Sequence, residues 1–207
     1  MKKFELTSET KINIFGKKLF RIKALVSFGV VKTGETGGWV EKEENVNQSG
    51  DAWVFDNAEV FGNARVFGNA RVFGNAWVFG NARVFDNARV SGNARVFGDA
   101  WVFDNAEVSD NAWVFDNARV SGNAEVSDNA EVSDNADYAT IHGFGTQFRT
   151  TTFFRCKDKQ VKVSCGCFYG TIPEFCEQVK NTRKGKIAEE YLMIADLMEK
   201  HFAEEAK

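Results

Sequence analysis

The side chains that most often move protons near neutral pH are scarce in this chain. Its 207 residues include two histidines, His142 and His201. Histidine has an ordinary pKa near neutrality, which suits it to act as a general base. His142 follows a long repetitive segment and His201 lies in a segment with helical periodicity, so the two form no local motif. We predict that neither histidine is catalytic.

Four cysteines are the other candidates for chemistry, as zinc ligands or as a redox pair. They are Cys156, Cys165, Cys167 and Cys176. We expect a β-hairpin that turns at residues 158–159, which would pair Cys156 with Val161 and Thr152 with Cys165. In that register one face of the hairpin would carry Phe154, Cys156, Val161, Val163, Cys165 and Cys167.

This register separates Cys156 from Cys165 by about four residue steps, roughly 13 Å, which is beyond the reach of one metal ion. Cys165, Cys167 and Cys176 could still meet, so a metal or redox site built from these three stays open. The prediction is nonetheless that the cysteines are reduced and buried as small apolar side chains, with no metal and no cofactor.

The most informative feature of the chain is a six-residue repeat between residues 51 and 139. Valine occupies every sixth position from Val54 to Val132, and Tyr138 closes the series. Alanine precedes each of these residues by two positions, and a Gly/Asp–Asn/Asp pair precedes each alanine. The unit is therefore Gly/Asp–Asn/Asp–Ala–x–Val–Phe/Ser, in which x is Arg, Glu, Trp or, once, Asp.

Alternation along an extended chain gives each unit an inner and an outer side. Alanine and valine share one side, whereas position x and the following Phe or Ser share the other. Charged side chains cannot line a narrow interior, so Ala and Val must point inward. The Gly/Asp–Asn pair supplies a corner, because these residues tolerate the left-handed backbone region. Short strands joined by identical corners predict a parallel β-helix, which is an all-β solenoid.

The Asp-Asn corners also suggest calcium ligands. Calcium-binding β-helices, however, use a nine-residue repeat, whereas this repeat has six residues with Ala inside. We predict instead that the corner amides, such as Asn57, Asn75 and Asn93, hydrogen-bond to one another along the stack.

A small residue, any residue and an aliphatic residue, with Gly-Asn or Asp-Asn corners, resemble the hexapeptide repeat of the trimeric LpxA-like superfamily. That resemblance implies a left-handed parallel β-helix with three hexads per coil. Fifteen hexads would then give five coils, roughly 24 Å long at about 4.8 Å per strand. The flanking segments GGWVEKE (37–43) and CGCFYGT (165–171) resemble a narrower group, the polymer-forming-like hexapeptide-repeat proteins of phages and prophages. The narrower resemblance implies no particular activity.

We divide the chain into three parts. Residues 1–50 are expected to form an N-terminal β cap and a first, imperfect coil that starts at Val40 and Val46. Residues 51–140 are the hexapeptide-repeat β-helix. Residues 141–207 are expected to form the hairpin and two helices, a small α+β module in which Thr171 caps the first helix. The second helix should pack inward through Ile187, Tyr191, Ile194, Leu197, Met198 and Phe202.

With three hexads per coil, residues eighteen apart stack on the outer surface. Outward aromatic side chains on this scale exceed what a soluble monomer usually exposes, which indicates an interaction surface. The alternative is that the rings stack within their own ladders and need no partner. The expected interface or ligand-binding residues are Phe61, Phe79, Phe97, Phe115, Trp77, Arg95 and Trp113 on one side and Arg65, Arg83, Trp101 and Arg119 on a second.

Two enzyme classes that use this fold can be compared with the sequence. Acyltransferases that resemble this repeat use a histidine in a coil or loop, but the repeat contains no histidine and no long loop interrupts it. A γ-type carbonic anhydrase needs three histidine ligands for zinc, which two histidines cannot supply. The alternatives that stay open are a hexapeptide acyltransferase-like enzyme and a purely structural, polymer-forming protein.

Charge and hydropathy limit the partners. The formal net charge is −3 at pH 7, and no apolar run is long enough for a transmembrane helix. These features argue against extended nucleic-acid binding and against a membrane partner. The leading hypothesis is a non-enzymatic scaffold that forms a dimer or trimer through its Phe/Trp/Arg ladders and binds a partner or a small anionic ligand. The phage resemblance implies an accessory or anti-defence role in the host cytoplasm, against a host defence protein or a signalling nucleotide.

Overall fold

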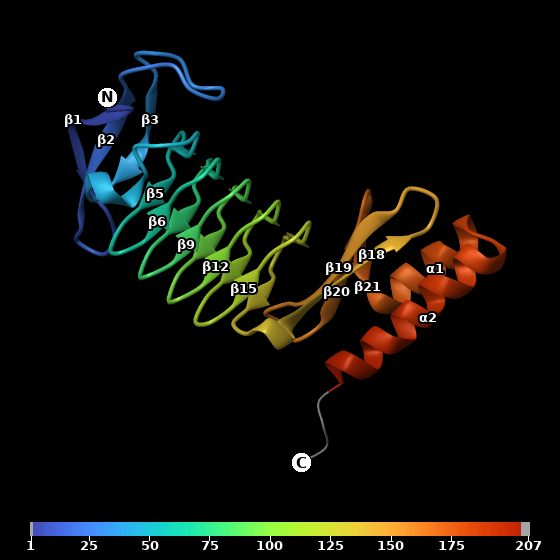
Figure 1. Cartoon of the computed structure of the whole chain (residues 1–207). Coiled ribbons are helices and arrows are strands. Elements are labelled where there is room, and N and C mark those ends of the chain that lie inside the picture. Colours follow the sequence, from blue (N-terminus) through green and yellow to red (C-terminus); the bar gives the residue numbers. More distant parts are fainter. Residues whose placement is uncertain (1, 204–207) are drawn as a thin grey trace.

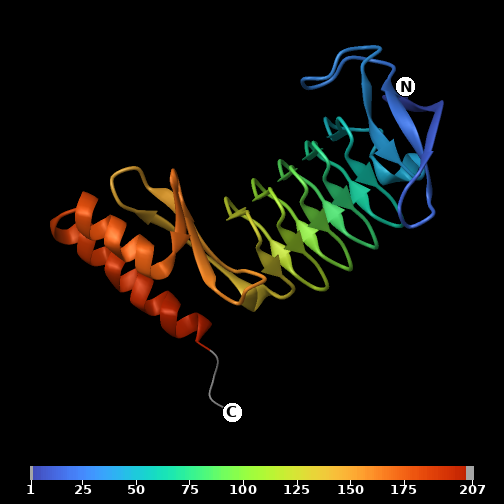
Figure 2. The ribbon, with the colours of Figure 1, turned by 180° about the vertical axis from the view of Figure 1, so that it is seen from behind.

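A parallel β-solenoid forms the centre of the molecule, with an antiparallel sheet at each end (Figure 1). The computed structural model describes residues 2–203. The N-terminal sheet lies at one end of the solenoid, and the C-terminal sheet with its helices lies at the other, as the view from behind also shows (Figure 2). The solenoid with a β cap and a small C-terminal α+β module, expected from the sequence, is confirmed.

Each solenoid strand consists of position x and the following valine, and it pairs in parallel with the strands eighteen residues away. Val78, for example, pairs with Val60 and Val96. Three hexads therefore make one turn, and the strands form three sides, which we call A, B and C. Side A contains β5 (Glu59–Val60), β8 (Trp77–Val78), β11 (Arg95–Val96), β14 (Trp113–Val114) and β17 (Glu131–Val132). Side B contains β4 (Trp53–Val54), β7 (Arg71–Val72), β10 (Arg89–Val90), β13 (Glu107–Val108) and β16 (Glu125–Val126). Side C contains β6 (Arg65–Val66), β9 (Arg83–Val84), β12 (Trp101–Val102) and β15 (Arg119–Val120).

The solenoid core consists of stacked alanines and valines. Each Ala and Val of the repeat from Ala52 to Val132 is at most 1% exposed. Burial of one valine side chain contributes roughly 1.5–3 kcal/mol, and the small alanines let the three sides approach closely. The inward register that the repeat predicts is confirmed.

The corners of the solenoid are left-handed turns held by side-chain amides. The first corner residue has a positive φ, such as 71° at Gly80 and 57° at Asp86. At the next position, Asn69 donates to Asn87 and Asn87 donates to Asn105, each over 3.1 Å. The expected ladder of corner amides is confirmed. The corners are therefore held by hydrogen bonds between protein groups.

The N-terminal cap covers the first turn of the solenoid and extends side A. Its elements are β1 (Phe4–Ile12), β2 (Lys18–Ala24), β3 (Thr36–Val40) and the 3-10 helix η1 (Glu43–Asn45). The strands β1, β2 and β3 are antiparallel neighbours, and β3 then pairs in parallel with β5 through Val40 and Val60. Val46 forms a bridge to Val66 on side C. Val40 and Val46 therefore start the first coil, as the sequence predicts.

The C-terminal module is a four-stranded antiparallel sheet with two helices packed on one face. Its elements are β18 (Tyr138–Phe144), β19 (Arg149–Arg155), β20 (Val161–Cys165), β21 (Phe168–Thr171), α1 (Ile172–Thr182) and α2 (Gly185–Phe202). Thr171 caps α1, because its hydroxyl accepts from the backbone of Glu174 while the Glu174 side chain accepts from the backbone of Thr171. Thr171 therefore caps the helix as expected, and Glu174 adds a reciprocal bond that the sequence analysis did not predict.

The repeat stops forming coil strands one hexad earlier than its sequence pattern indicates. The 3-10 helix η2 (Asn135–Asp137) replaces the expected strand, Ala136 is exposed, and Tyr138 already belongs to β18. The carboxylate of Asp137 accepts hydrogen bonds from the backbone and the hydroxyl of Ser133. This hexad is the one with Asp at position x, and its short carboxylate turns the chain out of the coil.

The hairpin between β19 and β20 differs from the one expected. The turn contains three residues instead of two, with Lys159 at a φ of 64°, and the N–H of Cys156 donates to the carbonyl of Gln160. Thr152 therefore pairs with Ser164 and not with Cys165. Side chains alternate along each strand, so a shift of one residue changes which side chains of β20 share a face with a given side chain of β19.

The shared face predicted for the cysteines is therefore wrong. Phe153, Val163 and Cys165 pack toward the helices, whereas Phe154 and Cys156 pack against the solenoid core. The hairpin thus uses one face to hold its helices and the other face to close the end of the solenoid.

The inward stripe predicted for α2 holds at all positions except one. Tyr191, Ile194, Met198 and Phe202 are buried, but Leu197 is 55% exposed. Leu197 adjoins Met198 in sequence and therefore lies about 100° away from it around the helix. The sequence placed Leu197 on the packed face, and the structure places it at the solvent side.

Candidate interaction surface

Side A carries a column of parallel phenyl rings on its outer surface. The ring centroids of Phe61, Phe79, Phe97 and Phe115 are separated by 5.0, 4.9 and 5.1 Å in successive pairs, and the rings lie within 8° of parallel. This separation is close to the spacing of paired strands, so the coil geometry itself stacks the rings. The last three rings remain partly exposed. The ladder therefore satisfies its ring faces internally and presents its ring edges to solvent.

Tryptophan and arginine alternate beside the phenyl column. The Arg95 guanidinium lies 4.6 Å from the ring centroid of Trp77 and 5.1 Å from that of Trp113. A cation–π contact of this kind contributes about 0.5–1 kcal/mol at an exposed site. The ammonium group of Lys157, in the β19–β20 turn, lies 4.9 Å from the Trp113 ring. The edge of Trp113 also meets Phe97 at 6.1 Å, so the two columns form one continuous surface.

Phe61 is not part of the open surface, contrary to expectation. It points outward, but it is only 5% exposed. Leu19 and Trp39 pack against it, and the ring of Phe15 lies 5.6 Å from it. The N-terminal hairpin folds back over the first rung of the ladder. Phe61 therefore belongs to the interior of the cap.

Phe15 is an aromatic side chain seated on the ladder from another part of the chain. Its ring centroid lies 5.6 Å from both Phe61 and Phe79 and 5.8 Å from Trp77. It lies in the turn between β1 and β2. The sequence analysis missed this contact. The signal was the apolar pair Ile14–Phe15 at a turn tip, where polar residues are usual.

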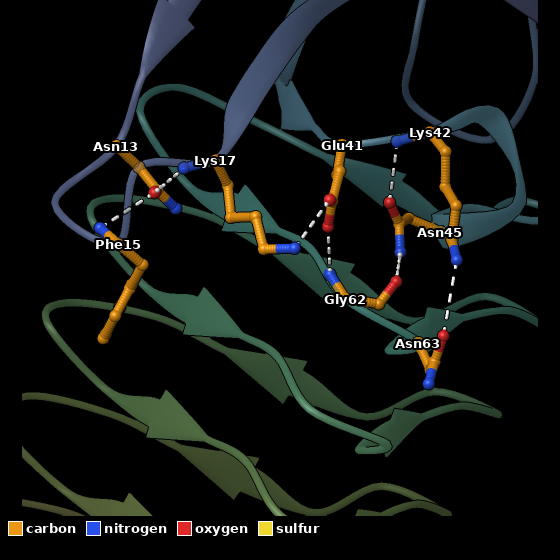
Figure 3. A network of polar contacts seen from close by, with 8 residues as sticks. All are labelled: Asn13, Phe15, Lys17, Glu41, Lys42, Asn45, Gly62 and Asn63. Carbon is orange, nitrogen blue, oxygen red and sulfur yellow. Dashed lines mark hydrogen bonds and ion pairs between the residues drawn. The ribbon is translucent and has the colours of Figure 1, made fainter.

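A network of polar contacts fixes the hairpin that carries Phe15 (Figure 3). The side-chain oxygen of Asn13 accepts hydrogen bonds from the backbone N–H groups of Phe15 and Lys17, each over 3.0 Å. The ammonium of Lys17 lies 3.2 Å from Glu41, whose other oxygen accepts from the backbone of Gly62 over 2.6 Å. The pKa of Glu41 is lowered, chiefly by the hydrogen bond from Gly62. The hairpin is thereby tied to the first coil.

Asn45 continues this network into the solenoid. It is fully buried, and its amide donates to the carbonyls of Gly62 (3.2 Å) and Ala64 (2.9 Å). Its oxygen accepts from the backbone of Lys42, and the ammonium of Lys42 reaches Asn63 (Figure 3). Buried backbone groups need partners, and Asn45 supplies them where the regular strand pairing has not yet begun.

Side C carries a shorter version of the same arrangement. The guanidinium groups of Arg83 and Arg119 lie 5.0 and 4.6 Å from the ring of Trp101. Phe67, Phe85 and Phe103 stack beside them at 4.8 and 5.0 Å. Arg65 stands at the N-terminal end of this column and pairs in register with Arg83. The eleven candidate residues thus fall on two neighbouring sides, seven on side A and four on side C.

The histidines and cysteines considered for acid–base or metal chemistry lie outside the solenoid coils. His142 is exposed on β18, 3.4 Å from the hydroxyl of Thr150, and His201 is exposed near the end of α2. Burial raises the pKa of the Cys156 thiol to about 11. In the part of the chain that the structure describes, no three His, Cys, Asp or Glu side chains are grouped closely enough to hold a metal ion. The trio Cys165, Cys167 and Cys176, left open by the sequence, is therefore not assembled as such a site.

Neither helix of the described chain is both long enough and apolar enough to cross a bilayer.

Comparison with known proteins supports the repeat. Residues 64–79 and 88–104 match the family described as the YdcK beta solenoid repeat. These segments cover strands of all three sides, and together with the five or so turns observed they define a repeat β-solenoid protein. No curated protein matches the chain.

Proposed function

We propose that this protein is a non-enzymatic scaffold that self-associates through the open part of side A. We call this part the open patch. It consists of Arg95, Phe97, Trp113 and Phe115, next to the two rings, Trp77 and Phe79, on which Phe15 sits. The observation that carries the proposal is Phe15, which sits on Phe79 and Trp77 and so demonstrates within one chain that the ladder accepts an aromatic side chain.

The chemistry of the open patch suits a contact between copies. Flat ring edges and guanidinium groups held by neighbouring indoles are preorganised, so their ordering adds little entropic cost to association. Aromatic and arginine side chains are also the types enriched at the centres of protein interfaces. Complete burial of a fully exposed phenylalanine contributes roughly 1.5–3 kcal/mol. Each ring of the ladder would contribute less, because its faces are already stacked on neighbouring rings.

The test is the oligomeric mass of a variant in which Phe97 and Phe115 are both changed to serine. Serine occupies the same repeat position at Ser133 on side A, so the coil should tolerate it. We expect unchanged circular dichroism and a dissociation constant raised by about one to two powers of ten, measured by light scattering over a dilution series.

A matched control exists on side C. Changing Phe85 and Phe103 to serine removes the same contacts, namely two stacked phenyl pairs and one edge contact to a tryptophan. This control should keep the oligomeric mass of the wild type. A monomeric wild-type protein, or equal weakening by the two double variants, would contradict the use of side A.

We propose two extensions of this function. A contact between unlike surfaces would add copies without closure, which is the polymer-forming alternative, and filaments in negative stain would identify it. The resemblance of the flanks to phage and prophage proteins supports an accessory, anti-defence role in a host cytoplasm. The partner would be a host defence protein or an anionic signalling nucleotide held near the Arg and Trp columns. Mass spectrometry of molecules released from native protein on denaturation tests that role.

A further inference from the structure

A cavity of about 320 Å³ lies in the C-terminal module, and none of its lining residues belongs to the open patch. It opens where β19, β20 and β21 meet the two helices, and its lining includes Arg149, Arg183 and Tyr191. This volume lies within the range of small-molecule binding sites.

The cavity carries positive charge that the protein does not neutralise. Its lining contains two arginines and no carboxylate. Within residues 2–203, neither Arg149 nor Arg183 forms an ion pair, whereas Arg155 and Lys162 of the same module pair with Asp137 and Asp128. A guanidinium presents a planar set of N–H donors that matches carboxylate and phosphate oxygens. The guanidinium of Arg183 donates to the carbonyl of Thr182 over 3.3 Å. Two guanidinium groups at one cavity that have no carboxylate partner within the described chain point to an anion.

The two arginines come from distant segments and line the same cavity as Tyr191. Arg149 begins β19 and Arg183 follows the end of α1. Tyr191 of α2 donates its hydroxyl to the carbonyl of Phe144 over 3.3 Å. Burial raises the pKa of Tyr191, and the charges of Arg183 and Arg149 oppose that rise. The fold therefore brings two cations from distant parts of the module to one cavity.

Two glycines make room for these groups. Gly166 forms the β20–β21 turn with a φ of 63°, and a Cβ atom there would collide with the guanidinium of Arg149. Gly145 has a φ of 71°, and a Cβ atom there would collide with the hydroxyl of Tyr191. The backbone thus leaves space at the two positions where the polar wall of the cavity is built.

Aromatic side chains form another part of the cavity lining. Phe175 lies 5.4 Å from Phe168 and 5.7 Å from Tyr191, measured between ring centroids. We call these three rings the aromatic wall. A polar edge beside an aromatic wall suits a ligand that has both a charged group and a flat apolar body.

We propose that this cavity binds a small aromatic anion whose phosphate or carboxylate group is held by Arg149 and Arg183. The flat body of the ligand packs against the aromatic wall. This site is independent of the self-association proposed for side A.

Isothermal titration of the full chain tests the proposal with phenyl phosphate and benzoate as separate probes. We expect the better of the two anions to bind with a dissociation constant below 1 mM, at which binding amounts to about 4 kcal/mol. Phenol, which lacks the anion, should bind at least tenfold more weakly. The relative affinity of the two anions distinguishes a phosphate site from a carboxylate site.

The matched pair of variants is Arg183→Gln and Lys180→Gln, since both residues are exposed cations at the end of α1 but Lys180 is outside the cavity lining. Arg183→Gln should weaken binding at least tenfold, and Lys180→Gln should leave it unchanged. Arg149→Gln should weaken binding as much as Arg183→Gln does. If Arg149→Gln does not fold, the result for Arg183→Gln decides the test. Equal effects of Arg183→Gln and Lys180→Gln, or no binding of either anion, overturn the proposal.

A second readout uses Cys167, an exposed thiol in the lining of the cavity. The bound anion should slow the alkylation of Cys167 by iodoacetamide at least threefold in the wild type. It should give no protection in Arg183→Gln at the same anion concentration. Equal protection in both proteins would place the ligand elsewhere and overturn the proposal.

Discussion

The ammonium nitrogen of Lys162 lies 2.8 Å from a carboxylate oxygen of Asp128, and this ion pair joins β20 of the C-terminal module to the last turn of the solenoid. Tyr169 donates its hydroxyl to the same oxygen over 2.8 Å. The hydroxyl of Ser164 reaches Glu125 of β16 over 2.8 Å. The module is therefore attached through polar contacts on side B as well as through Phe154 in the core.

The first prediction concerns the pH dependence of this attachment. Hydrogen bonds from Lys162 and Tyr169 lower the pKa of Asp128, and Asp128 raises the pKa of Lys162. The lowered carboxyl pKa stabilises the fold above the unfolded value of about 3.9, and that contribution is lost as pH falls through the folded value. The raised pKa of Lys162 stabilises the fold below about 10.4, and that contribution is lost as pH rises through the folded value.

We therefore expect Asp128→Asn to lower the free energy of unfolding by about 1 kcal/mol, a small value because the carboxylate is partly solvated. The loss should be constant from about pH 5 to 9 and should shrink below about pH 4, in urea titrations followed by circular dichroism. Asp110→Asn is the control, because Asp110 occupies the same corner one turn earlier and makes no ion pair within the described chain. An equal loss in both variants at pH 7 would argue against the ion pair.

The second prediction concerns the core of the repeat. Val96 is fully buried, so Val96→Asp would place an unpaired carboxylate among alanines and valines and destabilise the fold by at least about 4 kcal/mol. Arg95→Ser, one residue away on the outer side, removes two cation–π contacts and should cost about 1–2 kcal/mol. Thermal unfolding compares the two. A folded Val96→Asp protein with the stability of the wild type would contradict the inward register.

The third prediction concerns the start of the solenoid. Asn45→Ala removes the hydrogen-bond partners of three backbone groups, one in a buried and two in part-buried hydrogen bonds, and should lower the free energy of unfolding by about 2–4 kcal/mol. Asn63→Ala removes only exposed side-chain contacts and should change it by less than about 0.5 kcal/mol. Chemical denaturation measures the two free energies of unfolding. Similar losses in the two variants would contradict the stabilising role of Asn45 at the start of the solenoid.

The fourth prediction concerns thiol reactivity. The thiolate is the reactive form, and burial raises the pKa of Cys156 to about 11, so little thiolate is present at pH 8. Cys167 is exposed in the β20–β21 turn. Peptide mapping after iodoacetamide treatment should show Cys167 modified at least tenfold faster than Cys156. Denaturant should remove the difference, and equal rates in the native protein would contradict the burial of Cys156.

The solenoid was predictable because one local rule repeats without a slip. Alternation of Ala and Val fixed the inward side, and the Gly/Asp–Asn pair fixed the corner, so a single correct assignment applied to every rung. The end of the repeat was harder to place, since Asp137 keeps the spacing of the series but turns the chain away by bonding to Ser133. The repeat pattern gives the position of each residue in the hexad, but it does not show that the Asp137 side chain hydrogen-bonds to a nearby backbone group.

The sequence predicted which residues stack on the candidate surface, but it did not predict which of them other parts of the chain cover. The stacking of Phe79 on Phe97 follows from three hexads per turn, but the burial of Phe61 depends on Phe15, which is 46 residues away in sequence. The register of the hairpin at Lys159 was also not predictable from the pattern. One additional turn residue shifted the pairing, so the side chains of β20 that share a face with those of β19 differ from the expected ones. The cavity beside Arg149 and Arg183 could not be predicted from the sequence, because its lining comes from three strands and two helices of the C-terminal module.

The eighteen-residue turn of the solenoid fixes the distance between its two ends in steps of one turn. Adding or deleting eighteen residues would move the C-terminal module along the axis by about 4.8 Å without rotating it. Adding or deleting six would instead carry it from one side to the next. Changes in chain length can therefore set the distance and the orientation between the Phe15 hairpin and the C-terminal cavity separately, in fixed steps.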